Sequence, residues 1–386
     1  MEMENKSENE VGKADTSQSI KRIAFITTPN FRQERLDELE SFFYAHMYSL
    51  CLNFDVLTTG NTNNALRTLT ERNFDKLTIE SHKAICNDLK LNAQNVKIDC
   101  DGDLQHWRET ILTQLETRTD FAVKGMIDVI YKVVRKKLDG LIHLTDWQDK
   151  SAKQDSAVLS REANVHNIPI ATNVETAEAF IEQWMSEIYG IKTGLIYTIP
   201  TPTNSNVTIN EGDLEKILDS SDPLKPKMLA MISHDGMKSD MDVFSVQYAD
   251  QIFPNFNYVL ATDSTGKRIK KLMKAMNRDN YADKIYCCKP GPEGGDLEIA
   301  YAVLKGCCND IFFFQDPKVS QPHDADIRLF EQAVTSKGVH ARFATNPASA
   351  ELLIKYHTNR AMSAAKSQSS QNPVSPQSTT MPAINA

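Results

Sequence analysis

The sequence predicts an α/β protein with two tandem doubly wound domains, each built on a mainly parallel sheet of about five strands with helices on both faces. Three observations support this fold class. Short apolar runs alternate with helical stretches along the chain, a rhythm typical of parallel sheets covered by helices. A segment rich in Pro, Asn, Ser and Asp at 200–225 separates two such regions. Motifs of the first region also recur in the second.

The second region, 226–360, contains the clearest strand pattern. Its five apolar runs are MLAMISH (228–234), FNYVLAT (256–262), KIYCCK (284–289), DIFFFQ (310–315) and VHARFAT (339–345). Each run is too short for a helix and is bounded by polar or turn-forming residues. We therefore expect five strands joined by helices in a flavodoxin-like arrangement.

The first region, 20–199, resembles the second. DGLIHLTD (139–146) aligns with NDIFFFQD (309–316), and IATNVETAEAFI (170–181) aligns with FATNPASAELLI (343–354). The first region is longer between its matching motifs, so we place an insertion at about 73–119. A diverged tandem duplication is the simplest interpretation, with 200–225 as the linker.

Composition limits the class of protein and of partner. The 386 residues carry a formal net charge of -8, which argues against nucleic acid and acidic membranes as general partners. No apolar run is long enough to span a bilayer and the N-terminus is acidic and polar, so we expect a cytoplasmic protein. The segments 1–19 and 361–386 are predicted to be disordered. The seven cysteines lack metal-ligand spacing and are predicted to be free.

Polar side chains follow the predicted strands of the second region. The carboxyl ends of parallel strands meet at one edge of a sheet, where ligands of doubly wound folds bind. The residues placed there are His234, Asp235, Lys238, Thr262, Ser264, Thr265, Gly291, Asp296, Asp316, His323 and Asp326.

Each of these residues also has a simple structural interpretation as a helix cap or a local pair. Their convergence favours function. Hydroxyls, a glycine N–H and a helix N-terminus suit a phosphate group, and carboxylates beside histidines suit proton transfer.

The strings SHDGMK, ATDSTG, GPEGGD, FFFQDP, PHDAD and FATNPASAE follow one another between 228 and 354. In their order and spacing they resemble the methylglyoxal synthase family, and NIPIATNVETAEAFI in the first region resembles the corresponding part of it. The resemblance implies a lyase without cofactor or metal that converts dihydroxyacetone phosphate into methylglyoxal and inorganic phosphate, and that assembles as a homo-oligomer. Inorganic phosphate is then the expected inhibitor.

The resemblance also assigns roles to residues. Asp296 would be the general base, and His323, supported by Asp326, would face the substrate's carbonyl oxygen. His234, Asp235 and Asp316 would line the catalytic site. The phosphate would be held by Lys238, Thr262, Ser264, Thr265 and Gly291. In GPEGGD, the glycines would form a crowded turn that places Asp296 at a helix start.

Some positions depart from the family pattern. Pro290 replaces a small hydroxyl residue before Gly291, and a C-terminal phosphate-binding arginine is not recognisable, although Arg360 lies nearby. In the first region, Thr28 and Pro29 stand where the second has His234 and Asp235. Met126 stands where the base is expected, while Asp146 and Asp155 remain. We expect the first region to be catalytically inactive and to serve assembly or regulation.

Two alternatives stay open. Domains resembling this family also act as non-catalytic regulatory modules that bind a phosphorylated ligand, and an inactive first region fits such a sensor. A phosphoacceptor receiver domain has the same alternating architecture, but no lysine ends its final strand at FATN (343–346).

Overall fold

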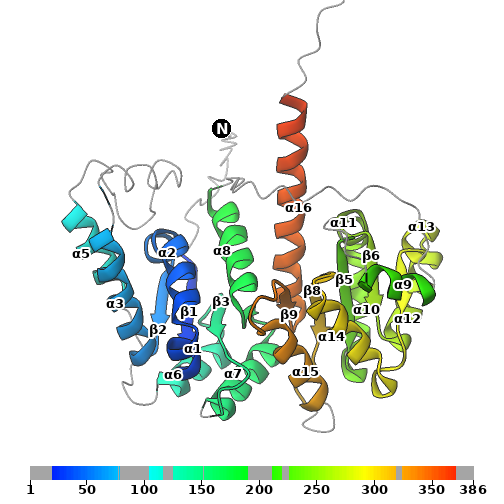
Figure 1. Cartoon of the computed structure of the whole chain (residues 1–386), viewed down its shortest axis with the longest axis horizontal. Helices are drawn as coiled ribbons and strands as arrows, with labels where there is room; N and C mark the ends of the chain where they lie inside the picture. Colours follow the sequence, from blue (N-terminus) through cyan, green and yellow to red (C-terminus); the bar gives the residue numbers. More distant parts are fainter. Residues whose placement is uncertain are drawn as a thin grey trace, which may run out of the picture.

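The structure is a computed structural model, which describes residues 20–76, 78, 104–115, 125–150, 152–189, 211–219, 226–318 and 324–370. Two parallel sheets, each covered by helices, lie on either side of a central pair of helices (Figure 1). This confirms the predicted α/β class. Within the described ranges, no helix is long and apolar enough to cross a membrane.

The first sheet has four parallel strands in the order β2-β1-β3-β4. Its strands are β1 (Arg22–Thr27), β2 (Asp55–Thr58), β3 (Gly140–Leu144) and β4 (Ile170–Ala171). Its helices are α1 (Pro29–Glu34), α2 (Leu36–Asn53), α3 (Gly60–Lys76), α5 (Leu104–Gln114), α6 (Gly125–Val134), α7 (Lys153–His166) and α8 (Val174–Tyr189).

The second sheet has five parallel strands in the order β7-β6-β5-β8-β9. Its strands are β5 (Met228–Ser233), β6 (Tyr258–Ala261), β7 (Ile285–Cys287), β8 (Cys308–Phe314) and β9 (Arg342–Ala344). Its α-helices are α9 (Glu211–Asp219), α10 (Lys238–Gln247), α11 (Ala249–Asn255), α12 (Asp263–Ala275), α13 (Asp279–Ala282), α14 (Gly295–Leu304), α15 (Asp324–Val334) and α16 (Pro347–Ser370). Two 3₁₀ turns, η1 (Asp235–Met237) and η2 (Gly291–Glu293), follow strands of this sheet.

Each of the five apolar runs in the second region coincides with or overlaps one strand. The first sheet has the same order without a strand that matches β7. The alignment offset would place that strand at 115–117, of which the structure describes only Leu115. The prediction of about five strands is therefore met in full by the second sheet.

Three hydrophobic layers hold the chain together. One lies between the first sheet and α6 and α7, and includes Val129 and Leu159. A second lies between the second sheet and α9, α14 and α15, and includes Phe330. The third is continuous across both regions and includes Phe180 of α8 and Leu353 of α16. Burying each such side chain contributes about 1.5–3 kcal/mol, so the shared layer joins the two regions.

The boundary between the regions is formed by the edge strands β4 and β9 and by α8 and α16, which pack against each other (Figure 1). Thr176 Oγ1 of α8 accepts the Phe343 N–H of β9 at 2.8 Å. Ser349 Oγ of α16 accepts the Ile170 N–H of β4 at 3.0 Å. Each helix thus supplies a hydroxyl to the edge strand of the other region, and these edge groups are no longer open to pairing with another chain.

Two expectations about irregular segments need correction. The segment expected to be a linker contains α9, whose Leu214 and Leu218 are buried against the second sheet. The predicted disordered tail begins at 361, but α16 continues to Ser370. The segment 1–19, most of the insertion at 73–119 and residues 371–386 lie outside the described residues. Within the insertion, α5 buries Trp107 and Ile111.

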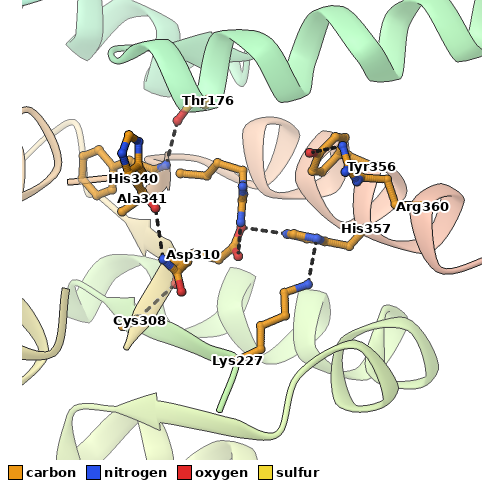
Figure 2. Close-up of polar contacts among 12 residues, drawn as sticks. Thr176, Lys227, Cys308, Asp310, His340, Ala341, Tyr356, His357 and Arg360 are labelled. Carbon is orange, nitrogen blue, oxygen red and sulfur yellow. Dashed lines mark hydrogen bonds and ion pairs between the residues drawn. The ribbon is translucent and has the colours of Figure 1, made fainter. Parts of the chain in front are cut away.

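A buried polar cluster lies at the amino-terminal edge of the second sheet (Figure 2). Asp310 accepts hydrogen bonds from Arg342 Nε at 2.7 Å and from Arg342 NH2 at 2.9 Å. His357 Nε2 lies 2.7 Å from Asp310 Oδ1, and Lys227 Nζ lies 3.0 Å from His357 Nδ1. Because Lys227 donates to Nδ1, the His357 proton sits on Nε2 and points at Asp310. Burial lowers the pKa of His357 to about 3, so the imidazole is neutral.

Candidate functional site

The predicted site residues that the structure describes follow the strands at the carboxyl-terminal edge of the second sheet. Strands β5 and β8 are neighbours there, while the chain runs outward from β5 to β6 and β7 on one side and from β8 to β9 on the other. This is the point at which the strand order reverses, where doubly wound sheets bind ligands.

His234 and Asp316 occupy the two strand ends at this point. The His234 N–H donates to Phe314 O at 3.1 Å, and the Asp316 N–H donates to His234 Nδ1 at 2.9 Å. Nδ1 is therefore unprotonated, and a neutral His234 carries its proton on Nε2.

Gly236 makes room for the Asp316 carboxylate. A Cβ at Gly236 would lie 2.0 Å from Asp316 Oδ2, so a larger residue there would displace this carboxylate. Asp316 Oδ1 accepts the Lys318 N–H at 2.9 Å. The turn after β5 and the turn after β8 thus fit together around one carboxylate.

Asp235 and Lys238 form an ion pair one turn apart, with Nζ 2.5 Å from Oδ1. The Asp235 side chain is 90% exposed, whereas that of Lys238 is 22% exposed. The lysine stem is thus mostly covered while its ammonium stays beside the edge of the sheet.

Hydroxyl groups collect at the N-terminus of α12. Thr262 is the N-cap of this helix, and its Oγ1 lies 3.3 Å from Thr265 Oγ1. Thr265 Oγ1 lies 3.3 Å from Ser233 Oγ at the end of β5. Thr262 and Thr265 are buried, whereas Ser264 is exposed. A helix N-terminus with nearby hydroxyls has the donors that an anion needs.

The GPEGGD segment forms a tight turn between β7 and α14. Pro290 O accepts the N–H groups of Glu293 at 2.9 Å and of Gly295 at 3.1 Å. A Cβ at Gly295 would lie 1.9 Å from Lys289 O, so only glycine fits. Gly294 has open space around it but a φ of 105°, a conformation that favours glycine. Position 295 is thus glycine because a Cβ would clash with the backbone, and position 294 is glycine because of its positive φ.

The turn delivers Asp296 to the first helical turn of α14, where it is 8% exposed. A Cβ at Gly291 would lie 2.6 Å from Asp296 Oδ2. The carboxylate therefore rests against the bare backbone of Gly291. Within the same turn, Glu298 Oε2 accepts the Lys289 N–H at 3.1 Å.

The other residues named from the sequence are either not fully described or lie away from the site. His323 lies outside the described residues, and Asp326 lies in the first turn of α15, where its side chain is not described. Arg360 is not at the site. It lies on α16 beyond His357, near the amino-terminal edge of the sheet, with its NH1 3.2 Å from Glu182 Oε2 and 3.0 Å from the Tyr356 hydroxyl (Figure 2).

The first region has the same frame with different side chains. Thr28 and Pro29 follow β1, and Asp146 follows β3 as Asp316 follows β8. Helix α6 begins at Gly125 as α14 begins at Gly295, so Met126 has the position of Asp296. The side chain of Met126 packs against the adjoining hydrophobic layer.

Sequence reasoning missed Ser233 and Gly236, whose roles depend on contacts between separate strand ends. It also missed a cleft of about 830 Å³ between the two regions. Of the predicted site residues that the structure describes, only Asp316 lines this cleft. In the described part of the chain, no group of three or more His, Cys, Asp or Glu side chains is arranged to hold a metal ion.

Comparisons with known proteins find methylglyoxal synthases that match about a third of the chain. No family model matches the chain. A methylglyoxal synthase from an Exiguobacterium species is 32% identical over 127 residues, which is 33% of this chain and 84% of that protein. The methylglyoxal synthase of Borreliella burgdorferi is 35% identical over 130 residues, 33% of this chain and 93% of that protein. A crystal structure of methylglyoxal synthase from Elizabethkingia anophelis aligns with a TM-score of 0.27 and 25% identity over 33% of this chain and 77% of that one.

Proposed function

We propose that this chain, which belongs to the methylglyoxal synthase family, converts dihydroxyacetone phosphate into methylglyoxal and inorganic phosphate in its second region. The relatives align over about a third of the chain. The segment 228–354, which carries the sequence motifs, has the same length. We therefore assign the activity to 226–360 and treat 20–199 as a separate functional unit.

The observation that carries the proposal is the position of Asp296. Its carboxylate is buried at the start of α14, against the backbone of Gly291 and at the ligand-binding edge of the sheet. Burial of a carboxylate has a free-energy cost, and a turn with two obligatory glycines maintains this one. A general base for carbon acid chemistry needs such fixed placement.

The reaction needs a base, a group that stabilises an oxyanion and a site for the leaving phosphate. In our proposal Asp296 removes a proton from the carbon beside the carbonyl, which leaves an enediolate. The enediolate then collapses as the C–O bond to phosphate breaks, and the resulting enol tautomerises to methylglyoxal. Charge on the carbonyl oxygen is the feature that the site must stabilise.

We assign the oxyanion role to His323 with Asp326, as the family resemblance implies. His234 supports the same edge, because the Asp316 N–H fixes its Nδ1 as an acceptor and directs Nε2–H as a donor. The Asp316 carboxylate is in turn held by Lys318 N–H and by the space over Gly236. This pair can therefore present one N–H donor of fixed direction.

The phosphate is proposed to lie at the N-terminus of α12. Lys238 supplies a positive charge, Thr262, Ser264 and Thr265 supply hydroxyls, and the Gly291 N–H adds a backbone donor. Helix N-termini and ammonium groups both stabilise phosphate. Bound there, the phosphate is held while its bond to carbon breaks.

The first region is proposed to be inactive, because a thioether at Met126 cannot accept a proton from carbon. Its role would be assembly, since it covers β9 and shares a hydrophobic layer with the second region.

A non-catalytic regulatory module is the second candidate, and one observation favours it. Pro290 has no N–H, and Arg360 is engaged with Glu182, so the phosphate has fewer donors than the sequence resemblance implies. Retention of Asp296, His234 and Asp316 together favours catalysis, because a phosphate sensor needs no base.

Turnover distinguishes the two. The full chain is incubated with dihydroxyacetone phosphate, and phosphate and methylglyoxal are measured separately. Equal amounts of both products are expected. Saturable binding of dihydroxyacetone phosphate without either product would favour the regulatory module.

A further inference from the structure

The cleft of about 830 Å³ lies between the two regions. From the first region it is lined by the segments that follow β1, β3 and β4 and by α7, and from the second by the segment that follows β8 and by α15. Its volume is within the roughly 300–1,000 Å³ typical of small-molecule sites. Parallel sheets bind ligands at their carboxyl-terminal edges, and both sheets turn such an edge towards this cleft.

Three buried polar atoms at the cleft lack hydrogen bonds. Thr28 Oγ1, Thr172 Oγ1 and Gln315 Nε2 find no partner in the described part of the chain. Thr28 is 3% exposed, and Thr172 and Gln315 are each 6% exposed. An unsatisfied buried polar group costs about 1–3 kcal/mol. All three residues line the cleft, so a bound molecule could supply the missing partners.

Gln315 is fixed in the orientation that leaves Nε2 free. Its Oε1 accepts a hydrogen bond from Asn164 Nδ2 at 3.1 Å, and Asn164 Oδ1 accepts one from Thr345 Oγ1 at 2.8 Å. The amide is thus anchored across the boundary between the regions. Its remaining N–H₂ is a donor that needs an acceptor from elsewhere.

The residues that line the cleft favour a ligand with hydroxyl groups over a ligand with a net charge. Four basic residues, among them Lys150 and Arg161, are balanced by four acidic ones, among them Asp146 and Asp316. Threonine hydroxyls donate and accept, carboxylates accept and the Gln315 amide donates. Trp147, whose side chain is 47% exposed, adds an apolar surface to the same cleft.

We infer that the cleft binds an uncharged, hydroxyl-rich molecule of monosaccharide size, a sugar or polyol, held by Thr28, Thr172 and Gln315 against Trp147. This site is distinct from the phosphate site at α12, and its binding does not depend on the proposed activity. A consequence for turnover does rest on that activity. Asp316 lines the cleft and also donates its N–H to His234, so an occupant of the cleft touches the catalytic edge.

Tryptophan fluorescence can report binding at this site. The chain has three tryptophans. Trp107 and Trp184 are buried, and Trp147 is the exposed one at the cleft. Glucose, ribose and sorbitol are titrated separately into the full chain while tryptophan emission is followed. At least one of them should change the emission saturably, and Trp147→Phe should abolish that change.

Two variants locate the binding. Thr172→Val and Gln315→Met should each weaken binding of the same probe by roughly two- to tenfold, the effect of one hydrogen bond. Thr70→Val is the matched control, because this buried hydroxyl already donates to Leu66 O in α3 and lies outside the cleft. The Thr70→Val chain should bind the probe with the same affinity as the unaltered chain.

The inference is overturned if none of the three probes changes the emission, or if binding is indifferent to both cleft variants. It is also overturned if only fructose 6-phosphate binds and inorganic phosphate displaces it, because the determinant is then an anion site. None of these readouts uses turnover, so failure of the proposed lyase activity would leave this test intact.

Discussion

Asn173 and Asn346 each donate a side-chain hydrogen bond into the other region, to carbonyls at equivalent positions. Asn173 Nδ2 lies 2.6 Å from Ala341 O, and Asn346 Nδ2 lies 2.9 Å from Ile168 O. Together with the reciprocal hydroxyls of Thr176 and Ser349, this gives the boundary an approximate two-fold symmetry. An interface in which equivalent groups contact each other reciprocally is isologous.

The first prediction concerns this pair. Asn173→Ala should lower the free energy of unfolding by about 1–3 kcal/mol, because it leaves the buried carbonyl of Ala341 without its donor. Chemical denaturation checks this. Asn309→Ala removes a similar but exposed amide bond, to His340 O, and should cost less than about 1 kcal/mol. Equal losses in the two variants would mean that the symmetric bonds do not stabilise the boundary.

The second prediction concerns the turn before α14. Gly291→Ala should lower kcat with little change in melting temperature, because a Cβ at 2.6 Å from Asp296 Oδ2 displaces the carboxylate. Gly295→Ala should instead lower the melting temperature, since its Cβ would meet Lys289 O at 1.9 Å.

The control for these two is Gly338→Ala. Gly338 has a φ of 80° and open space around it, so alanine there should cost about 1 kcal/mol of stability and no activity. If Gly291→Ala had normal kcat, the contact with Asp296 would not matter for turnover.

The third prediction concerns the anion site. Inorganic phosphate should inhibit competitively with dihydroxyacetone phosphate. Lys238→Met should weaken the binding of both the substrate and inorganic phosphate. A charge-assisted hydrogen bond contributes about 1.5–3 kcal/mol, so KM should rise at least about tenfold. Lys267→Met is the control, because Lys267 is exposed and paired with Asp263. Loss of inhibition in the control alone would place the phosphate elsewhere.

The fourth prediction concerns acid stability. His143 of β3 is fully buried, and burial lowers its pKa from 6.5 to about 4. The folded chain therefore binds fewer protons than the unfolded chain between these values. The contribution of His143 to the free energy of unfolding is fully present above pH 6.5. It falls by on the order of 3 kcal/mol as the pH drops towards 4.

The matched variant for this effect is His143→Gln, which cannot titrate. Its melting temperature should fall less steeply than that of the unaltered chain between pH 6.5 and 4. Parallel slopes in the two proteins would mean that His143 is not the group responsible.

The sequence predicted the second sheet well because each strand is a short, buried apolar run with polar residues at its ends. It also predicted that His234 and Asp316 lie at neighbouring strand ends, where the structure joins them by a hydrogen bond, since the carboxyl-terminal edge of a parallel sheet is a consequence of topology. It did not predict α9, because Pro, Asn and Ser around 200–225 obscured the pair Leu214 and Leu218.

Other features could not be predicted from one sequence. Gly236 and Asp316 are distant in the chain, and their fit depends on how two turns meet. The cleft between the regions depends on the packing of α8 against α16, which composition does not encode. The repeated ATN string aligns the two regions, but only the structure shows that its asparagines bind across the boundary.

The most direct test of the account is the turnover of Asp296→Asn with dihydroxyacetone phosphate, with folding verified by melting temperature. Asparagine keeps the size of the side chain but cannot accept a proton from carbon, so kcat should fall by about 10²–10⁴ or more. Glu293→Gln changes an exposed carboxylate in the same turn and should keep normal turnover. A loss smaller than about tenfold in Asp296→Asn would show that this carboxylate is not the base, which would contradict the proposed mechanism.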